Sequence, residues 1–228
     1  MPSLERNDQV FVLHLDDSNP ENRFSPTWLD EVGVLLDEVE ASTGPAGLVT
    51  VGGPKFYSNG LDVEHLMAPG TDIGAYLDRV HALYARILVL PMPTVAAITG
   101  HAFGAGAMLA VIHDGRLMRA DRGYFCLPEV ALGMAFTTGM NALLLERLPR
   151  TVAIEAMTTA RRFGGNEAAE RGIVEAAAPL DDLLPAAIER AAGNAGNRGE
   201  VLGRIKRDIH RPVLDALAVA APATLSGT

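Results

Sequence analysis

Residues 94–109 read TVAAITGHAFGAGAML, an apolar run that meets a turn with three glycines and continues in small apolar residues. Residues 48–63, LVTVGGPKFYSNGLDV, have the same order of an apolar run, a glycine-bearing turn and a further segment. A continuous apolar run is typical of a strand that is covered on both faces, and we expect a helix to open within residues 100–111. Strands alternating with helices indicate an α/β fold, in which ligands gather where strands end and helices begin.

The rest of the chain extends this alternation. Ser25 and Pro26 supply an N-cap and a first-turn proline for a helix over residues 26–41, and Pro91 ends a long helix over residues 73–88. From residue 137 onward the chain is expected to be mostly helical. The expected strands cover residues 10–15, 48–51, 94–99, 117–119, 124–127 and 173–175.

Length and composition are those of one globular enzyme domain. The 228 residues are 48% hydrophobic and 21% charged, enough for a single large core. The formal net charge of −9 argues against a nucleic-acid partner but leaves room for a small anionic ligand held by a few local cations. The lone Cys126 excludes an internal disulfide and points to a reducing compartment.

No address or anchor is visible in the sequence. The N-terminal MPSLERNDQV has neither a signal-peptide pattern nor an arginine-rich amphipathic one, and no apolar run reaches the about 20 residues that span a membrane. Ser226, Gly227 and Thr228 form no peroxisomal or retention signal. We therefore expect a soluble, cytoplasmic protein.

The two glycine turns have two interpretations. The backbone N–H groups at a helix start have no partner inside the helix, and glycine and alanine leave them open to a ligand oxygen. Donors from two such turns would converge into an oxyanion hole. The alternative is close helix packing, which small residues also permit. Residues 52–60 lack the Gly-Lys-Ser/Thr ending of a phosphate-binding loop, and no dinucleotide fingerprint is present.

Four segments in register carry a resemblance to a known family. They are FYSNGLDV (56–63), GHAFGAGAMLAVIHD (100–114), LPEVALGM (127–134) and RRFGGNEAAERGIVEAA (161–177). In order and spacing the chain resembles the crotonase (enoyl-CoA hydratase/isomerase) superfamily over its whole length, and within it the 3-enoyl-CoA to 2-enoyl-CoA isomerases of the plant and bacterial branch. The resemblance implies a single domain over 1–228 with the ClpP-like crotonase fold: a spiral α/β core of strand–strand–helix units over 1–180, and C-terminal helices over 181–228 that mediate trimerisation.

The resemblance also implies the substrate and the oxyanion hole. The substrate would be an acyl thioester of coenzyme A in fatty-acid metabolism (β-oxidation), so coenzyme A is part of the substrate and no separate cofactor is expected. Position by position, the motifs put the two N–H donors on Leu61 and Ala105. Many relatives have glycine at the second position, and alanine keeps the backbone donor.

The carboxylates decide between two reactions. Hydratases of this family use two glutamates, because adding water needs one group to hold the water and one to manage the proton. Here Met108 stands at the first position and Glu129 at the second. One carboxylate suits a proton shuttle from carbon 2 to carbon 4 of a 3-enoyl thioester. The expected apolar pocket should exclude water and raise the pKa of Glu129; its lining is Phe103, Met108, Met134 and Phe136.

Other polar residues have ordinary alternatives. We interpret Asp62 as a structural residue of the loop after the first donor, and His113 and Asp114 as a hydrogen-bonded pair, so that no metal is expected. Cys126 is interpreted as a small buried residue. The candidates for the coenzyme A phosphates, each with a solvated surface role as its alternative, are Lys55, Lys206 and Arg207.

Three rival functions remain at this point: a hydratase that works with one glutamate, an acyl-CoA binding protein without chemistry, and a trimeric scaffold. The C-terminal segment has more apolar residues at helical spacing than one short helix buries, and the family resemblance implies that this region assembles a homotrimer or a hexamer. These residues are Val201, Ile205, Ile209, Val213, Leu214 and Leu217.

Overall fold

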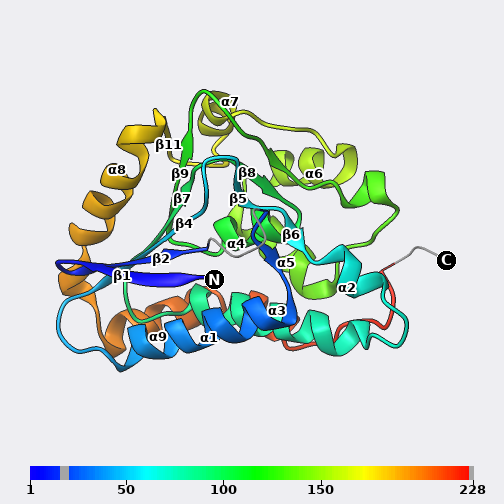
Figure 1. Ribbon diagram of the computed structural model, residues 1–228, viewed down its shortest axis with the longest axis horizontal. Coiled ribbons are helices and arrows are strands. Elements are labelled where there is room, and N and C mark those ends of the chain that lie inside the picture. The colour runs from blue at the N-terminus through cyan, green and yellow to red at the C-terminus, as the bar shows by residue number, and fades with distance from the viewer. Residues whose placement is uncertain (16–20, 226–228) are drawn as a thin grey trace.

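The computed structural model describes residues 1–15 and 21–225. Residues 226–228, in which the sequence shows no targeting signal, lie outside the described residues. The centre of the structure is a six-stranded sheet in the order β1–β2–β4–β7–β9–β11 (Figure 1). The first pair is antiparallel and the remaining pairs are parallel. The strands are β1 Ser3–Asn7, β2 Val10–His14, β4 Gly47–Val51, β7 Thr94–Ile98, β9 Gly115–Arg119 and β11 Ala176–Ala178.

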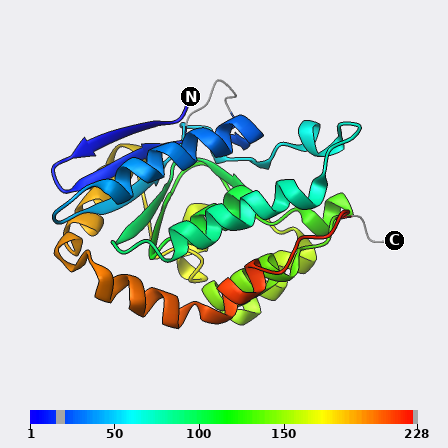
Figure 2. The same cartoon turned by 90° about the horizontal axis from the view of Figure 1, so that it is seen from below.

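Helices cover both faces of this sheet. Alternate residues of the strands, such as Val49 and Val95, pack against helix α8 (Leu180–Ala192). The residues between them, such as Leu48 and Ala96, face the main core. Helices α1 (Pro26–Ala41) and α3 (Ile73–Leu88) supply much of that core and lie side by side along the molecule (Figures 1 and 2). The hydrophobic runs of the sequence are therefore strands buried on both faces, as expected of a parallel sheet.

A second, smaller sheet shows that the chain is built from repeated units. After each of β4, β7 and β9 the chain forms one short strand of a three-stranded parallel sheet ordered β10–β8–β5, and helical structure follows. These short strands are β5 Phe56–Ser58, β8 His101–Phe103 and β10 Phe125–Cys126. A two-stranded pair, β3 Arg23–Phe24 and β6 Gly60–Leu61, lies beside them. These repeated strand–strand–helix units are the ones that the family resemblance implied.

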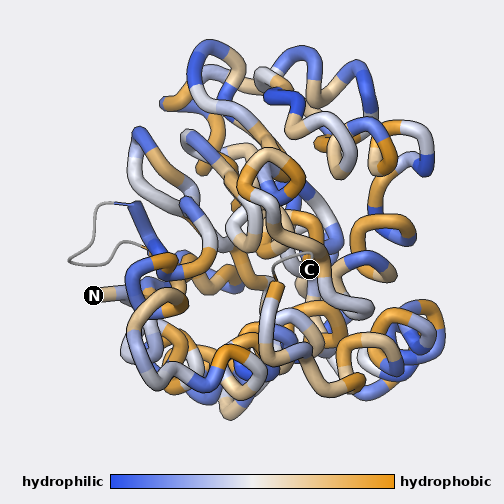
Figure 3. The backbone as a smooth tube through the Cα atoms, turned by 90° about the vertical axis from the view of Figure 1, so that its right-hand side faces the viewer, coloured by the Kyte–Doolittle hydropathy of each residue, from blue (hydrophilic) through white to orange (hydrophobic). Residues whose placement is uncertain are grey.

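From residue 137 onward the chain is mostly helical, as expected. Figure 3 shows that hydrophobic and hydrophilic residues are interspersed along the whole described chain. None of the helices within residues 1–15 and 21–225 has the length and apolar content needed to cross a membrane. The remaining helical segments are α2 Val63–Met67, α4 Ala105–Val111, η1 Glu129–Leu132, α5 Thr138–Arg147, α6 Arg150–Thr159, α7 Gly165–Glu170, η2 Ala195–Asn197, α9 Glu200–Ile209 and α10 Arg211–Leu217.

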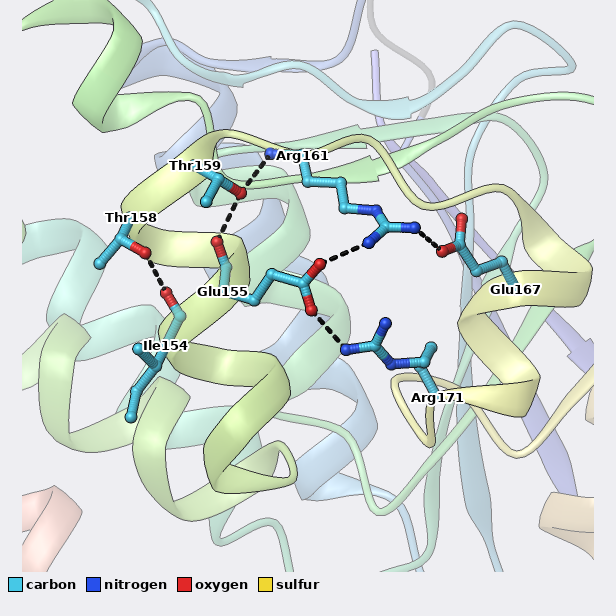
Figure 4. Close-up of polar contacts among 7 residues, drawn as sticks. All are labelled: Ile154, Glu155, Thr158, Thr159, Arg161, Glu167 and Arg171. Atoms are coloured by element: carbon cyan, nitrogen blue, oxygen red, sulfur yellow. Dashed lines mark hydrogen bonds and ion pairs between the residues drawn. The ribbon is translucent and has the colours of Figure 1, made fainter.

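An ion-pair network fixes the connection between α6 and α7. The carboxylate of Glu155 accepts from Arg161 at 2.5 Å and from Arg171, and Arg161 also pairs with Glu167 (Figure 4). Both guanidinium groups lie over the ring of the buried Phe163. Through Arg161 the network connects Glu155 of α6 with Glu167 of α7.

The helix expected to open within residues 100–111 is α4, which begins at Ala105 directly after strand β8. One expected strand is wrong in its position. The last strand is residues 176–178, three residues after the expected 173–175, because the N–H groups of Ile173 and Val174 bond to Ala168 O at the end of α7. Pairing with β9 begins only beyond them.

Candidate active site

The first glycine turn is held by buried polar contacts. Ser58, at the end of β5, donates its hydroxyl to Asn22 O at 2.7 Å and accepts from Gly60 N at 3.1 Å. Gly60 has φ of +85°, a conformation that glycine adopts without strain. The chain then enters β6, so that Leu61 follows a turn whose shape is fixed on both sides.

The second turn lies directly against the first. A Cβ on Gly60 would stand 2.7 Å from Phe103 O and 2.9 Å from Ala105 N, so only glycine fits there. Gly106 is equally close to the first turn, because its Cβ would stand 2.4 Å from Ser58 O. The glycines therefore permit close packing, which is one of the two expected interpretations. The same packing brings Leu61 and Ala105 into one site. As the first residue of α4, Ala105 has an N–H group without an acceptor inside the helix.

A cavity of about 260 Å³ opens at these turns. Five of the expected residues, Leu61, Ala105, Phe103, Met108 and Met134, line it, together with Glu129. Phe136 does not line it and packs against the main core. The sequence did not point to the remaining lining residues, which are Asn59, Val63, Leu66, Gly104, Pro128, Leu132, Met140 and Leu225.

Leu225 is part of the cavity wall, whereas the expected Phe136 is not. The carbonyl of Leu225 accepts from Ala135 N at 2.7 Å, which fixes the C-terminal segment beside the pocket. Thr137 caps α5, and Met140 on that helix lines the cavity. A contact between residues 135 and 225 has no local signal in the sequence. Only the tertiary structure therefore shows that Leu225 lines the pocket.

Glu129 is the one ionisable side chain among the described residues that line the cavity. It begins the short helix η1, and its Oε1 lies 3.2 Å from the point that a Cβ on Gly104 would occupy. Its Oε2 is buried without a hydrogen-bond partner among the described residues. Burial raises the pKa of Glu129 to about 7, because the charged form loses its hydration. A carboxyl group in this state accepts and returns a proton near neutral pH.

Met108 takes the place of a second carboxylate. It lies one turn into α4, where its N–H bonds to Gly104 O at 3.0 Å, and it is buried. Its thioether is a weak hydrogen-bond acceptor and lines the same cavity as Glu129. The arrangement thus offers one proton carrier in an otherwise apolar pocket.

Three cations lie near His101 and Phe103, the second of which lines this pocket. The Arg162 guanidinium lies 5.6 Å from the centre of the Phe103 ring, and His101 packs against the same ring at 4.9 Å. Burial lowers the pKa of His101, and the positive charges of Arg162, Arg122 and Lys55 lower it further. Lys55 is exposed, as expected, and its ammonium lies 5.2 Å from the Phe56 ring. The sequence signal that we missed is the Arg161–Arg162 pair.

Lys206 and Arg207 lie elsewhere. Lys206 is buried, bonds to Met92 O at 2.7 Å and pairs with Asp114 at 2.5 Å. A buried ammonium needs such partners, so Lys206 is committed to the fold and we do not propose it as a coenzyme A contact. Arg207 is exposed on α9.

The residues that we interpreted as structural are hydrogen-bonded or buried. Asp62 caps α2 by accepting from His65 N at 3.2 Å. His113 and Asp114 are both hydrogen-bonded but not to each other: His113 bonds to Thr50 and to Leu109 O, and Asp114 to Thr94 and Lys206. Cys126 is buried. Within the described residues no three His, Cys, Asp or Glu side chains are grouped as a metal site would require.

Comparison with known proteins identifies one family over nearly the whole chain. The enoyl-CoA hydratase/isomerase family profile matches residues 5–224. A peroxisomal enoyl-CoA delta isomerase of Arabidopsis thaliana is 32% identical, over 94% of this chain and 91% of that protein. A probable enoyl-CoA hydratase of Mycobacterium bovis is 28% identical, over 79% of this chain and 70% of that protein. A crystal structure of a probable enoyl-CoA hydratase of Mycobacterium tuberculosis superposes with a TM-score of 0.88 at 26% identity, covering 96% and 92% of the two chains.

Proposed function

The chain belongs to the enoyl-CoA hydratase/isomerase family, and we propose that within this family it is an isomerase that moves the double bond of an acyl-CoA from position 3 to position 2. The observation that carries the proposal is the composition of the pocket: one carboxyl group, that of Glu129, faces apolar side chains that include Met108. A hydratase needs a second polar group to hold its water. The similarity to an Arabidopsis enoyl-CoA delta isomerase supports the same reaction.

In this proposal the thioester carbonyl accepts from the N–H groups of Leu61 and Ala105. Their turns pack directly against each other, and both residues line the cavity. Donors fixed in this way stabilise the negative oxygen that forms when the carbon next to a thioester loses a proton. Each such donor contributes roughly 3 kcal/mol in related chemistry.

The proton then moves through Glu129. Its carboxylate removes a proton from carbon 2, and the electrons of that C–H bond form a dienolate that spans the carbonyl oxygen and carbons 1 to 4. The protonated Glu129 returns the proton to carbon 4, and the double bond comes to rest between carbons 2 and 3. A carboxyl pKa of about 7 serves both steps, because it makes the group a stronger base than an exposed glutamate and still an acid.

The three cations near His101 and Phe103 mark the proposed position of the coenzyme A phosphates. Arg162 lies over Phe103, which lines the pocket, and the charges of Arg122 and Lys55 act on His101, whose ring packs against Phe103. Arg162→Gln should therefore raise KM for an enoyl-CoA several-fold and leave KM for a truncated thioester without phosphates unchanged. The exposed Arg207→Gln is the matched control, and equal KM values in all three proteins would contradict this position.

The hydratase remains the second candidate, since the Mycobacterium bovis relative has that name. A binding protein without chemistry is disfavoured by the unpaired, buried carboxylate oxygen of Glu129, which costs free energy of folding and gives such a protein no benefit. A pure scaffold is disfavoured by the apolar cavity itself.

The test of the proposed function is turnover. Purified protein is incubated with 3-enoyl-CoA substrates of several chain lengths, and the products are identified by mass spectrometry and by the absorbance of the conjugated thioester. We expect 2-enoyl-CoA from the wild type and almost none from Glu129→Gln. Absence of any double-bond migration by the wild type at all chain lengths would contradict the proposal.

A further inference from the structure

Three tyrosines are buried deep in the main core, and each hydroxyl has a partner. Two of them, Tyr76 and Tyr84, lie eight residues apart on α3, about two turns along one side of the helix. The third, Tyr57, lies on β5. A buried tyrosine hydroxyl needs a hydrogen bond, but these partners differ in one respect: both tyrosines of α3 bond to the turns that form the candidate active site.

Tyr76 holds the first turn. Its hydroxyl accepts from Asp62 N at 3.0 Å and donates to Phe24 O at 2.7 Å. Asp62 N belongs to the peptide unit that directly follows Leu61, and Phe24 is the strand partner of Leu61. The hydroxyl therefore ties β3, the end of β6 and α3 together at the residue proposed as the first donor.

Tyr84 holds the second turn. Its hydroxyl donates to Ala105 O at 2.7 Å. Ala105 is the first residue of α4, and its own N–H is the second proposed donor. Fixing the carbonyl of this residue restricts the rotation of the first turn of α4 about the helix axis. Burial raises the pKa of Tyr76 and of Tyr84, so both hydroxyls remain protonated and able to donate at any physiological pH.

We infer that Tyr76 and Tyr84 are positioning residues that hold the two halves of the oxyanion hole at a fixed separation, with α3 as the common support. That the two turns form an oxyanion hole rests on the proposed function. That α3 supports both turns rests on the hydrogen bonds alone. Donors act well only within about 2.7–3.1 Å of the developing oxyanion, and a misplacement of 1 Å costs about a hundredfold in rate. Two direct bonds from one rigid helix limit such misplacement.

Tyr57 provides a matched control. It is as buried as the other two, and its hydroxyl bonds at 2.8 Å to Thr50, which belongs to neither donor turn. Removal of any one of the three hydroxyls costs a buried hydrogen bond and should lower the melting temperature by a similar amount. Only the two removals on α3 should affect the donors.

The experiment compares the wild type with Tyr76→Phe, Tyr84→Phe and Tyr57→Phe. Isomerisation of 3-enoyl-CoA gives kcat and KM, thermal unfolding gives stability, and hydrogen–deuterium exchange with mass spectrometry follows the peptides that contain residues 60–62 and 104–106. We expect kcat to fall about tenfold in each α3 variant with KM changed less than twofold, and faster exchange at the turn that each tyrosine holds. Tyr57→Phe should keep the wild-type kcat and exchange at both turns.

Equal changes of kcat in all three variants, or none in any, would show that the bonds are merely structural and would overturn the inference. If the wild type does not isomerise 3-enoyl-CoA, the proposed function fails, and exchange decides the inference separately. Faster exchange confined to the turn held by the substituted α3 tyrosine still supports it, and identical exchange in all proteins overturns it.

Discussion

Glu129 combines a chemical role with a cost to the fold. Its folded-state pKa of about 7 lies above the unperturbed value of 4.5, so between these pH values the folded protein keeps a proton that the unfolded chain has lost. Stability therefore falls as the pH rises through this window, by up to about 3 kcal/mol once the carboxylate is fully ionised. In the proposed mechanism the same loss of hydration makes the carboxylate of Glu129 a stronger base than an exposed glutamate.

Glu129→Gln should separate the two effects. The isomerisation rate should fall by about a thousandfold or more, since general-base catalysis supplies 10²–10⁴. The free energy of unfolding at pH 8 should rise above that of the wild type, because the buried charge is gone, and at pH 4 the two proteins should be equal. Denaturant titrations at both pH values measure this. Retention of most of the activity by Glu129→Gln would contradict the role of Glu129 as the proton carrier. A difference in stability between the two proteins that grows toward low pH would contradict its raised pKa.

Met108→Glu tests the apolar neighbour of Glu129. A second carboxylate in the cavity would repel the first, raise its pKa further and slow isomerisation by about tenfold or more at pH 7. It would also give water a partner, although slow hydration is the weaker expectation because nothing orients the new group. Met108→Leu keeps the volume of the side chain and serves as the control. Equal isomerisation rates in Met108→Glu and Met108→Leu would count against the importance of an apolar side chain at this position.

At the scale of elements, local signals predicted the long helices and missed what distant contacts decide. Ser25 does cap α1 and Pro26 does begin it, as the sequence indicated. Strand β8 has only three residues and exists because β5 and β10 pair with it. The alanines of β11 have low strand propensity, and register with β9 alone places them in the sheet. Leu225 likewise lines the pocket because of a distant contact, the hydrogen bond from Ala135 N to its carbonyl.

The C-terminal segment closes part of the pocket through Leu225, so it should help to set the acyl chain length. Leu225→Ala removes three carbons from the wall and should shift the preferred 3-enoyl-CoA toward longer chains, measured as kcat/KM across a series of chain lengths. Val219→Ala changes an exposed residue of the same segment and is the control. An unchanged chain-length profile in Leu225→Ala would show that the acyl chain does not reach this wall.

At the scale of the whole molecule, the C-terminal helices bury only part of their apolar surface. Val213 and Leu217 are buried in the core, whereas Val201, Ile205 and Ile209 are 75%, 49% and 60% exposed along one side of α9. Their spacing of four residues makes this a continuous stripe. The sequence predicted an excess of apolar residues here, but only the fold separates those that pack internally from those that stay exposed.

We therefore propose a homotrimer or a dimer of trimers, with the exposed stripe of α9 in an interface. Light scattering should show an oligomer at micromolar concentration, and Ile205→Glu should lower its mass toward that of the monomer. Val34→Glu alters a similarly exposed side chain on α1 and should leave the mass unchanged. A wild type that is monomeric under these conditions would contradict the proposal.

The central claim is that one carboxylate in a pocket without a second polar catalyst moves a double bond and does not add water. The measurement that tests it most directly is the fate of 2-enoyl-CoA in water with the wild-type protein, set against its rate on 3-enoyl-CoA of equal chain length. The account predicts rapid conversion of 3-enoyl-CoA to 2-enoyl-CoA and only trace formation of 3-hydroxyacyl-CoA. Rapid formation of 3-hydroxyacyl-CoA from 2-enoyl-CoA would identify a hydratase and would contradict the role given to Met108.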